Sequence, residues 1–140
     1  MAGISFEDEQ ACAALSARYS YYCDRERDRV ADLFTEDAVL ELVGRTMRGR
    51  DEIRKGMAPR PGVITLHFCT NTVIDLIDPT NAKGSTHLLS LGHEGEVKQF
   101  PLPMPVARTG GIYIDRFRKV DGRWLFSERR LDRIFTGARS

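Results

Sequence analysis

The stretch VITLHFCTNTVIDLID, residues 63–78, has the period-two pattern of one long β-strand. One set of alternate positions is mostly apolar and predicts a hydrophobic sheet face: Ile64, Leu66, Phe68, Thr70, Thr72, Ile74 and Leu76. The other set carries an imidazole, a thiol and an amide: Thr65, His67, Cys69, Asn71, Val73 and Asp75. A solvent-facing strand would normally present Lys, Glu or Arg, and none occurs between Val63 and Ile74. We therefore expect the second face to line an enclosed cavity, with His67 as a candidate base.

The composition is that of one globular domain spanning residues 1–140. Hydrophobic residues make up 41% of the chain and charged residues 29%, and a chain of this length buries roughly two-thirds of its unfolded surface. The net charge of +1 leaves no electrostatic footprint for nucleic acid. No apolar run approaches the roughly 20 residues of a membrane span. Neither nucleic acid nor a membrane is expected as a partner.

The N-terminal MAGISFEDEQ lacks the basic-then-apolar order of a signal peptide. The three cysteines, Cys12, Cys23 and Cys69, form no CxxC pattern. Reduced thiols in a cytoplasmic protein are the expectation. Three widely spaced histidines without a nearby acidic motif predict no metal site, and no cofactor is expected.

The first predicted helix begins after Ser5, a capping hydroxyl, and runs to about Asp24. An acid at a helix C-terminus opposes the helix dipole, by roughly 0.3–1 kcal/mol when exposed. A nearby imidazole would compensate for Asp24. The alternative is a solvated acid among the neighbouring arginines.

The remaining pattern is short helices followed by long strands, which predicts an α+β domain with helices covering one face of a curved sheet. A two-residue turn at Asp121-Gly122 predicts a hairpin between the last two strands. The expected elements are a short helix from Asp28 through Phe34, a strand Ala38–Val43, a turn or short strand pair at RTMR, a helix Asp51–Met57, and strands 63–78, 82–92, 109–120 and 123–134.

The segment His93–Pro105 has proline at every second position from residue 101 onward, which favours an extended, semi-rigid crossing. Phe100, Leu102 and Met104 stand between these prolines and could close over an opening. The segment is therefore a lid, a plain loop or a subunit contact.

The succession DRVADLFTEDAVLEL, GRDEIRKGM, LHFCTN and GGIYIDRFRKVDGRWLFSERR resembles the SnoaL-like branch of the nuclear transport factor two-like superfamily. The resemblance covers nearly the whole chain and implies a cone-shaped α+β barrel, with N-terminal helices packed on a strongly curved, mostly antiparallel sheet. Within this branch the chain looks most like the scytalone dehydratase and hexachlorocyclohexane dehydrochlorinase lyases. Those enzymes pair an Asp ending the first helix with a His in the first long strand. The matching residues here are Asp24 and His67.

Candidate substrate-binding residues follow from the same resemblance and from the strand alternation: Tyr22, Cys69, His93, Tyr113 and Arg129. His87 is the alternative to His93 as a second cavity histidine. Three departures leave the substrate open. Tyr113 stands where the dehydratase has Asn, Cys23 where it has Tyr, and Tyr19 where the dehydrochlorinase has Lys.

The resemblance implies a cofactor-independent lyase, dehydratase-like, acting on a small hydrophobic hydroxylated or cyclic compound. An unperturbed histidine has a pKa near 6.5, suited to a general base, and a carboxylate on its other nitrogen fixes the tautomer. An isomerase or polyketide cyclase would use the same pair. A non-catalytic ligand-binding module or a dioxygenase small-subunit-like scaffold is the alternative from another class, in which His67 is structural. A homo-oligomer, trimer or dimer, is expected by analogy.

Overall fold

The computed structural model describes residues 3–137 of the chain. Its elements are α1 (Phe6–Arg25), the 3₁₀ helix η1 (Arg27–Leu33), β1 (Phe34–Leu42), β2 (Arg45–Arg48), α2 (Arg50–Gly56), β3 (Val63–Asp78), β4 (Asn81–Glu94), β5 (Thr109–Val120) and β6 (Arg123–Thr136). Within this part of the chain, no helix is long and apolar enough to span a membrane.

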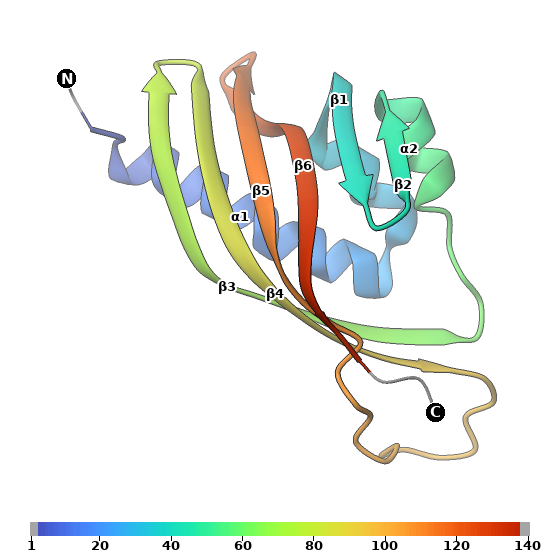
Figure 1. Cartoon of the computed structure of the whole chain (residues 1–140). Coiled ribbons are helices and arrows are strands. Elements are labelled where there is room, and N and C mark those ends of the chain that lie inside the picture. The colour runs from blue at the N-terminus through green and yellow to red at the C-terminus, as the bar shows by residue number, and fades with distance from the viewer. Residues whose placement is uncertain (1–2, 138–140) are drawn as a thin grey trace.

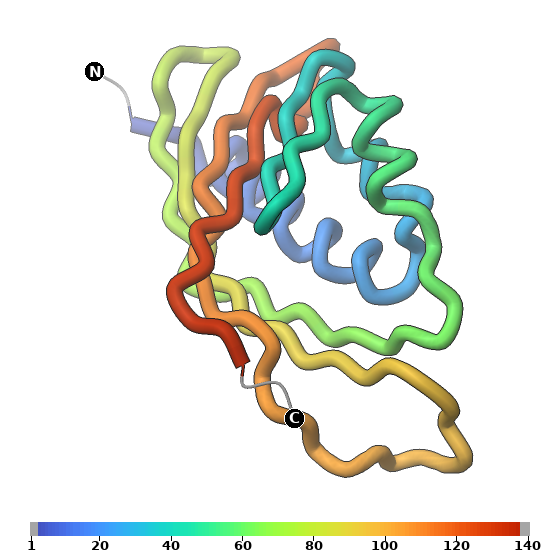
Figure 2. The backbone as a smooth tube through the Cα atoms, turned by 45° about the vertical axis from the view of Figure 1, so that its right-hand side comes forward, coloured from blue at the N-terminus to red at the C-terminus, as the bar shows by residue number. Residues whose placement is uncertain are grey.

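The six strands form one sheet in the order β2-β1-β6-β5-β4-β3. β1 and β6 run parallel, and the other neighbours are antiparallel. The sheet curves around α1, which lies along one of its faces, while α2 packs beside β2 (Figures 1 and 2). The strands β2 and β3 are free edges, so the sheet does not close into a barrel. The α+β cone predicted from the sequence is confirmed.

An aromatic core holds α1 against the sheet. Tyr19 of α1 meets the rings of Phe34, Tyr113 and Phe126 edge-on, at centroid distances of 6.2, 5.6 and 6.2 Å. Phe117 lies 5.3 Å from Phe126, and these rings are buried. Edge-to-face contacts of this kind add to the stabilisation from burial. The helix is therefore fixed along its middle, which positions its last turn against β3.

The predicted start of α1 is confirmed, because the Ser5 hydroxyl accepts a hydrogen bond of 3.1 Å from the Asp8 amide. The next two elements differ from the prediction. The second helix is a 3₁₀ helix without a side-chain cap, and β1 begins at Phe34 instead of Ala38. The reason is tertiary, since Phe34 already pairs in parallel with Phe126 before a register shift ahead of Val39.

A β-bulge in β3 changes which side chains face α1. Thr70 pairs with His87, but the next pair joins Val73 to Ser85, so β3 contains one extra residue. Asn71 takes up this residue with a φ of 55°, a left-handed conformation that Asn tolerates. The bulge reverses the alternation. The predicted single alternation through residue 78 is therefore wrong beyond Thr70.

Two faces follow from this bulge. Before the bulge, the inner face, toward α1, carries Thr65, His67 and Cys69. After the bulge it carries three members of the predicted apolar set: Thr72, Ile74 and Leu76. The outer face carries Ile64, Leu66 and Phe68. Leu66 and Phe68 remain 49% and 46% exposed, so the described part of the chain covers this apolar row only in part.

The connection from β4 to β5 contains no helix or strand, in agreement with the predicted extended crossing. It leaves the end of β4 and turns back below the start of β3 and the end of β4 to reach β5 (Figures 1 and 2). The predicted hairpin at Asp121-Gly122 is confirmed, with φ values of 51° and 79° in a two-residue turn.

Candidate functional site

Asp24 and His67 lie in direct contact where the last turn of α1 meets β3. The Nδ1 atom of His67 is 2.6 Å from Oδ1 of Asp24. The backbone N–H of His67 donates to Oδ2 at 3.0 Å, and the Thr65 hydroxyl donates to Oδ1 at 2.8 Å. The acid at the helix end is therefore held by a ring, an amide and a hydroxyl of one strand. We call these two residues the Asp24–His67 pair.

Burial and hydrogen bonding act in opposite directions on the pKa of the Asp24 carboxyl. Burial by itself would raise the pKa of the Asp24 carboxyl, but the hydrogen bonds from His67 and Thr65 hold its pKa below the usual 3.8. An ionised carboxylate can only accept. Nδ1 of His67 therefore carries the donated proton, and in the neutral ring this tautomer has its lone pair on Nε2.

The second ring nitrogen is available to another molecule. Among the described residues, Nε2 of His67 has no hydrogen-bond partner, and it is not one of the fully buried unpartnered atoms. The His67 side chain keeps 17% of its exposure and the Asp24 side chain 11%. The pair is thus shielded but reachable, which is the arrangement a general base requires.

A pocket of about 240 Å³ adjoins Asp24 and Thr65. Arg27 and Arg60 contribute to its rim, and Arg27 donates a 2.9 Å hydrogen bond to the Ala58 carbonyl. This bond ties the segment before β3 to the start of η1. Burial and the neighbouring charge of Arg60 lower the pKa of Arg27. Charged groups therefore border the pocket beside the Asp24–His67 pair, and the rings of the aromatic core are not part of its lining.

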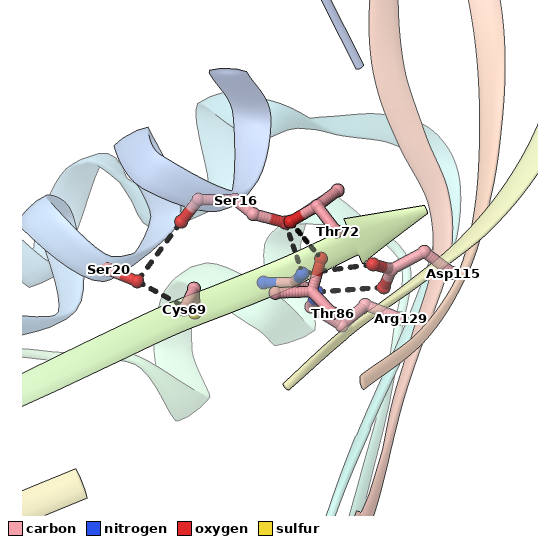
Figure 3. Close-up of polar contacts among 7 residues, drawn as sticks. All are labelled: Ser16, Ser20, Cys69, Thr72, Thr86, Asp115 and Arg129. Carbon is pink, nitrogen blue, oxygen red and sulfur yellow. Dashed lines mark hydrogen bonds and ion pairs between the residues drawn. The ribbon is translucent and has the colours of Figure 1, made fainter. Parts of the chain in front are cut away.

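Cys69 lies two residues beyond His67 on the same inner face. Its Sγ accepts a hydrogen bond of 2.9 Å from the Ser20 hydroxyl (Figure 3). The Ser20 Oγ also lies 3.1 Å from the Ser16 carbonyl one turn earlier in α1, so its single proton is shared between the two acceptors. Burial raises the pKa of the Cys69 thiol, so this cysteine is protonated at neutral pH and is poorly suited to be a nucleophile.

Arg129 lies inside the molecule with no exposed side-chain surface. It makes two hydrogen bonds to Asp115, at 2.8 and 3.0 Å, and one of 2.7 Å to Ser16 (Figure 3). Its guanidinium stacks 3.9 Å from the Tyr113 ring centre and 4.5 Å from that of Tyr19. Burial would lower the pKa of Arg129, but the Asp115 carboxylate raises it above its usual value. The guanidinium therefore stays charged.

One donor of this buried group is unused, because Nη1 of Arg129 has no hydrogen-bond partner among the described residues. The Tyr113 ring covers the guanidinium, and burial raises the pKa of the Tyr113 hydroxyl, which therefore remains protonated. Beside them, the hydroxyls of Thr72 and Thr86 lie 2.9 Å apart (Figure 3). The interior thus offers hydrogen-bond donors within an otherwise aromatic setting.

Two of the candidate binding residues lie elsewhere. Tyr22 is two positions from Asp24, about 200° around the helix, and it contacts Arg29 on the other side of α1, with the Arg29 guanidinium 4.8 Å from its ring. His93 pairs with Ile64 and so points to the outer face. His87 pairs with Thr70 and is exposed on that same face. Neither histidine shares the inner face with His67.

Sequence reasoning missed four polar partners at this site. Thr65 shares the parity of His67, two residues away, and this spacing could have indicated its contact with Asp24. Ser16 and Ser20 are four residues apart, so they share one helix face. No pattern in the sequence indicated that Asp115 would be the acid for Arg129. Among residues 3–137, no group of three or more His, Cys, Asp or Glu is placed to hold a metal ion.

Comparison with known proteins identifies the family. The model of the SnoaL-like domain matches residues 5–130. The chain therefore belongs to the SnoaL-like domain family. No protein of curated function matches it in sequence.

Solved structures share this fold over most of the chain. A candidate scytalone dehydratase from Novosphingobium aromaticivorans has 27% identity and a TM-score of 0.77, with 91% of this chain and 84% of that chain covered. A type 2 hexachlorocyclohexane dehydrochlorinase, LinA, has 21% identity and a TM-score of 0.79, with 95% and 90% covered. ActVI-ORFA from Streptomyces coelicolor has 16% identity and a TM-score of 0.72, with 89% and 96% covered. The latter two likenesses concern the fold alone.

Proposed function

We propose that this protein is a lyase that needs no cofactor and that eliminates water, or another leaving group, from a small hydrophobic hydroxylated or cyclic compound. The observation that carries the proposal is the 2.6 Å contact between Nδ1 of His67 and the Asp24 carboxylate, with Nε2 left free. Membership of the SnoaL-like family and the likeness to a candidate scytalone dehydratase support it.

His67 acts as the base in this proposal. Its Nε2 takes a proton from a carbon next to a carbonyl or next to the carbon that bears the leaving group. The electrons of the broken C–H bond form the new double bond, and the leaving group departs with the electrons of its own bond. Asp24 stabilises the imidazolium as it forms, and positioned general-base catalysis contributes roughly 10²–10⁴-fold. When hydroxide leaves, the imidazolium can return the proton, so that water is released.

Three inner side chains are proposed to bind the substrate. Arg129 offers the unused Nη1 donor, Tyr113 offers a protonated hydroxyl, and Cys69 borders His67. Arg129 and Tyr113 are buried, so substrate binding to them requires that the side chains around them rearrange. Tyr22 and His93 are not included, since they lie away from the pair.

The test is a screen of apolar β-hydroxyketones, monitored by the absorbance of the conjugated product. His67→Ala and Asp24→Asn are expected to abolish turnover while the circular dichroism spectrum is retained. His87→Ala is the matched control, because His87 lies on the outer face of the neighbouring strand and should keep full activity. A fully active His67→Ala variant would refute the proposal.

The same proton abstraction could serve an isomerase or a polyketide cyclase, which differ in where the proton is delivered. Product analysis by mass separates them, because only elimination lowers the mass by that of the leaving group. A non-catalytic binding module or scaffold would convert none of the compounds and would bind them equally well after Asp24→Asn.

Self-association belongs to the proposal as well. An apolar row crosses the outer face, in which Phe68 pairs with Leu89 and Gly110 of β5 lies between Leu89 and Phe135. These three large side chains are exposed, and contiguous exposed apolar surface marks interaction sites. Light scattering after size-exclusion chromatography is expected to give a dimer or trimer, and Phe68→Glu should dissociate it.

A further inference from the structure

A second pocket lies on the outer face of the sheet, away from the Asp24–His67 pair. Its volume is about 250 Å³. Ile64, Leu66 and Leu91 form its sheet side, and Phe100, Leu102 and Met104 of the proline-spaced segment form the opposite side. The chain itself therefore supplies both walls of what we call the outer pocket.

The outer pocket contains one polar feature that the fold leaves unused. His93 belongs to its lining, and Nε2 of His93 is buried without a hydrogen-bond partner among the described residues. A buried polar atom normally has a partner, because removal from water without compensation costs free energy. Apart from Thr65, whose hydroxyl donates to Asp24, the other side chains that line the pocket are apolar and supply no partner.

We infer that the outer pocket is a second binding site, for a small aromatic alcohol whose hydroxyl pairs with Nε2 of His93. Apolar walls with a single polar group that fixes orientation are the usual construction of a small-molecule site. A hydroxyl both donates and accepts, so it satisfies Nε2 in either tautomer of the neutral ring. The volume accommodates a molecule with two fused rings.

This inference is independent of the proposed lyase activity. The site lies across the sheet from the Asp24–His67 pair, with Thr65 in the lining of both pockets. The segment Phe100–Pro105, which the sequence presented as a lid, a loop or a subunit contact, becomes the cover of this outer pocket. A molecule held there would leave the inner face free.

The test uses 1-naphthol and 1-methylnaphthalene, which differ by a hydroxyl in place of a methyl group. Binding to the full chain is measured by titration calorimetry and by shifts of backbone amide resonances. A ligand of this size is expected to bind with a Kd of roughly 0.1–1 mM. The hydrogen bond should favour 1-naphthol by about 2- to 10-fold, with the shifts centred on residues 64–66, 91–93 and 100–105.

His93→Phe is expected to remove the preference for 1-naphthol and to leave the affinity for 1-methylnaphthalene unchanged. His87→Phe, on the same face of β4 but outside the pocket, should behave as the wild type, and so should Asp24→Asn. Leu102→Glu changes only the covering segment and should abolish binding of both compounds, which provides a test that spares the strands.

Equal affinity for the two compounds, or a preference that survives His93→Phe, would overturn the inference. Shifts centred on residues 24, 67 and 69 would overturn it too, because the compounds would then occupy the inner site. A wild-type oligomer that binds neither compound, while a dissociated variant does, would show that a second copy of the chain fills the outer pocket instead.

Discussion

Two hydrogen-bonded side-chain pairs join different elements of this molecule, and they differ in their access to water. The Asp24–His67 pair links α1 to β3 and keeps part of both side chains exposed. The pair of Asp115 and Arg129 links β5 to β6 and is almost completely buried. The first pair has a ring nitrogen that can take up a proton. The second has a charge that burial and a bidentate carboxylate hold in place.

This difference in exposure suggests that the accessible pair serves the reaction and that the buried pair serves the stability of the fold. The Asp24–His67 pair keeps contact with water, and a carboxylate beside an imidazole stabilises the imidazolium that forms when the ring takes up a proton. A guanidinium without solvent contact must keep its counter-ion, since an unpaired buried charge is costly. We therefore expect changes at the buried pair to affect stability most, and changes at the accessible pair to affect turnover most.

The largest effect on stability is expected from Arg129→Met, which leaves Asp115 buried without its partner. The free energy of unfolding should fall by about 3–5 kcal/mol, as measured by urea denaturation. The double variant Asp115→Leu with Arg129→Met removes both charges and should recover most of this loss. A single variant as stable as the wild type would contradict the assignment of this pair as structural.

A smaller loss is expected from Asp24→Asn, which removes the charge that accepts three hydrogen bonds. Hydrogen bonds to charged groups contribute about 1.5–3 kcal/mol, and the remaining exposure of the pair places the loss near the lower end. Its matched comparison is Thr65→Val, which removes only the hydroxyl donor and should cost less. If Asp24→Asn lost more stability than Arg129→Met, the accessible pair would contribute more to stability than the buried pair, which would contradict the proposal.

The pH dependence of stability tests the same pair. Because hydrogen bonds lower the pKa of Asp24 below 3.8 in the folded state, the unfolded chain takes up the proton first as the pH falls. The stabilisation from Asp24 should be complete above about pH 5 and decline progressively as the pH falls below about 4. The measurement is the difference in unfolding free energy between the wild type and Asp24→Asn across this range. A difference that grows on acidification would contradict a lowered pKa.

The smallest effect is expected from Ser20→Ala, which removes the hydroxyl that donates to Cys69. A neutral hydrogen bond to sulfur is weak, so the loss should stay below about 1 kcal/mol. The released thiol should still react slowly with iodoacetamide at neutral pH, because its pKa is raised by burial. Rapid alkylation in the wild type would show that Cys69 is more accessible than its position suggests.

Local patterns were sufficient for most element boundaries. The β3 and β5 ranges and the Asp121-Gly122 turn follow from alternation and turn chemistry, which depend on neighbouring residues only. The pairing of the acid with the imidazole was expected from the resemblance and from the position of an acid at a helix end. The lyase activity itself stays a prediction.

Other features depended on partners distant in the chain. The bulge at Asn71 changed the inner face of β3 beyond Thr70, because one residue more on β3 than on β4 reverses every later side chain. The outward direction of His93 has a separate cause, because His93 pairs with Ile64 in the regular part of the ladder, ahead of the bulge. Tyr22 lies away from the Asp24 side chain for a simpler reason, because two residues along an α-helix correspond to a rotation of about 200°.

The sequence by itself determined the α+β class, the order of the elements and the chemical types at the site, because these depend on periodicity, turn residues and helix ends. Only the tertiary structure decided which side chains share the interior, that Asp115 neutralises Arg129, and that His93 lies in a separate pocket. Strand register and the curvature of the sheet around α1 produce those contacts, and both arise from pairing between residues far apart in the chain.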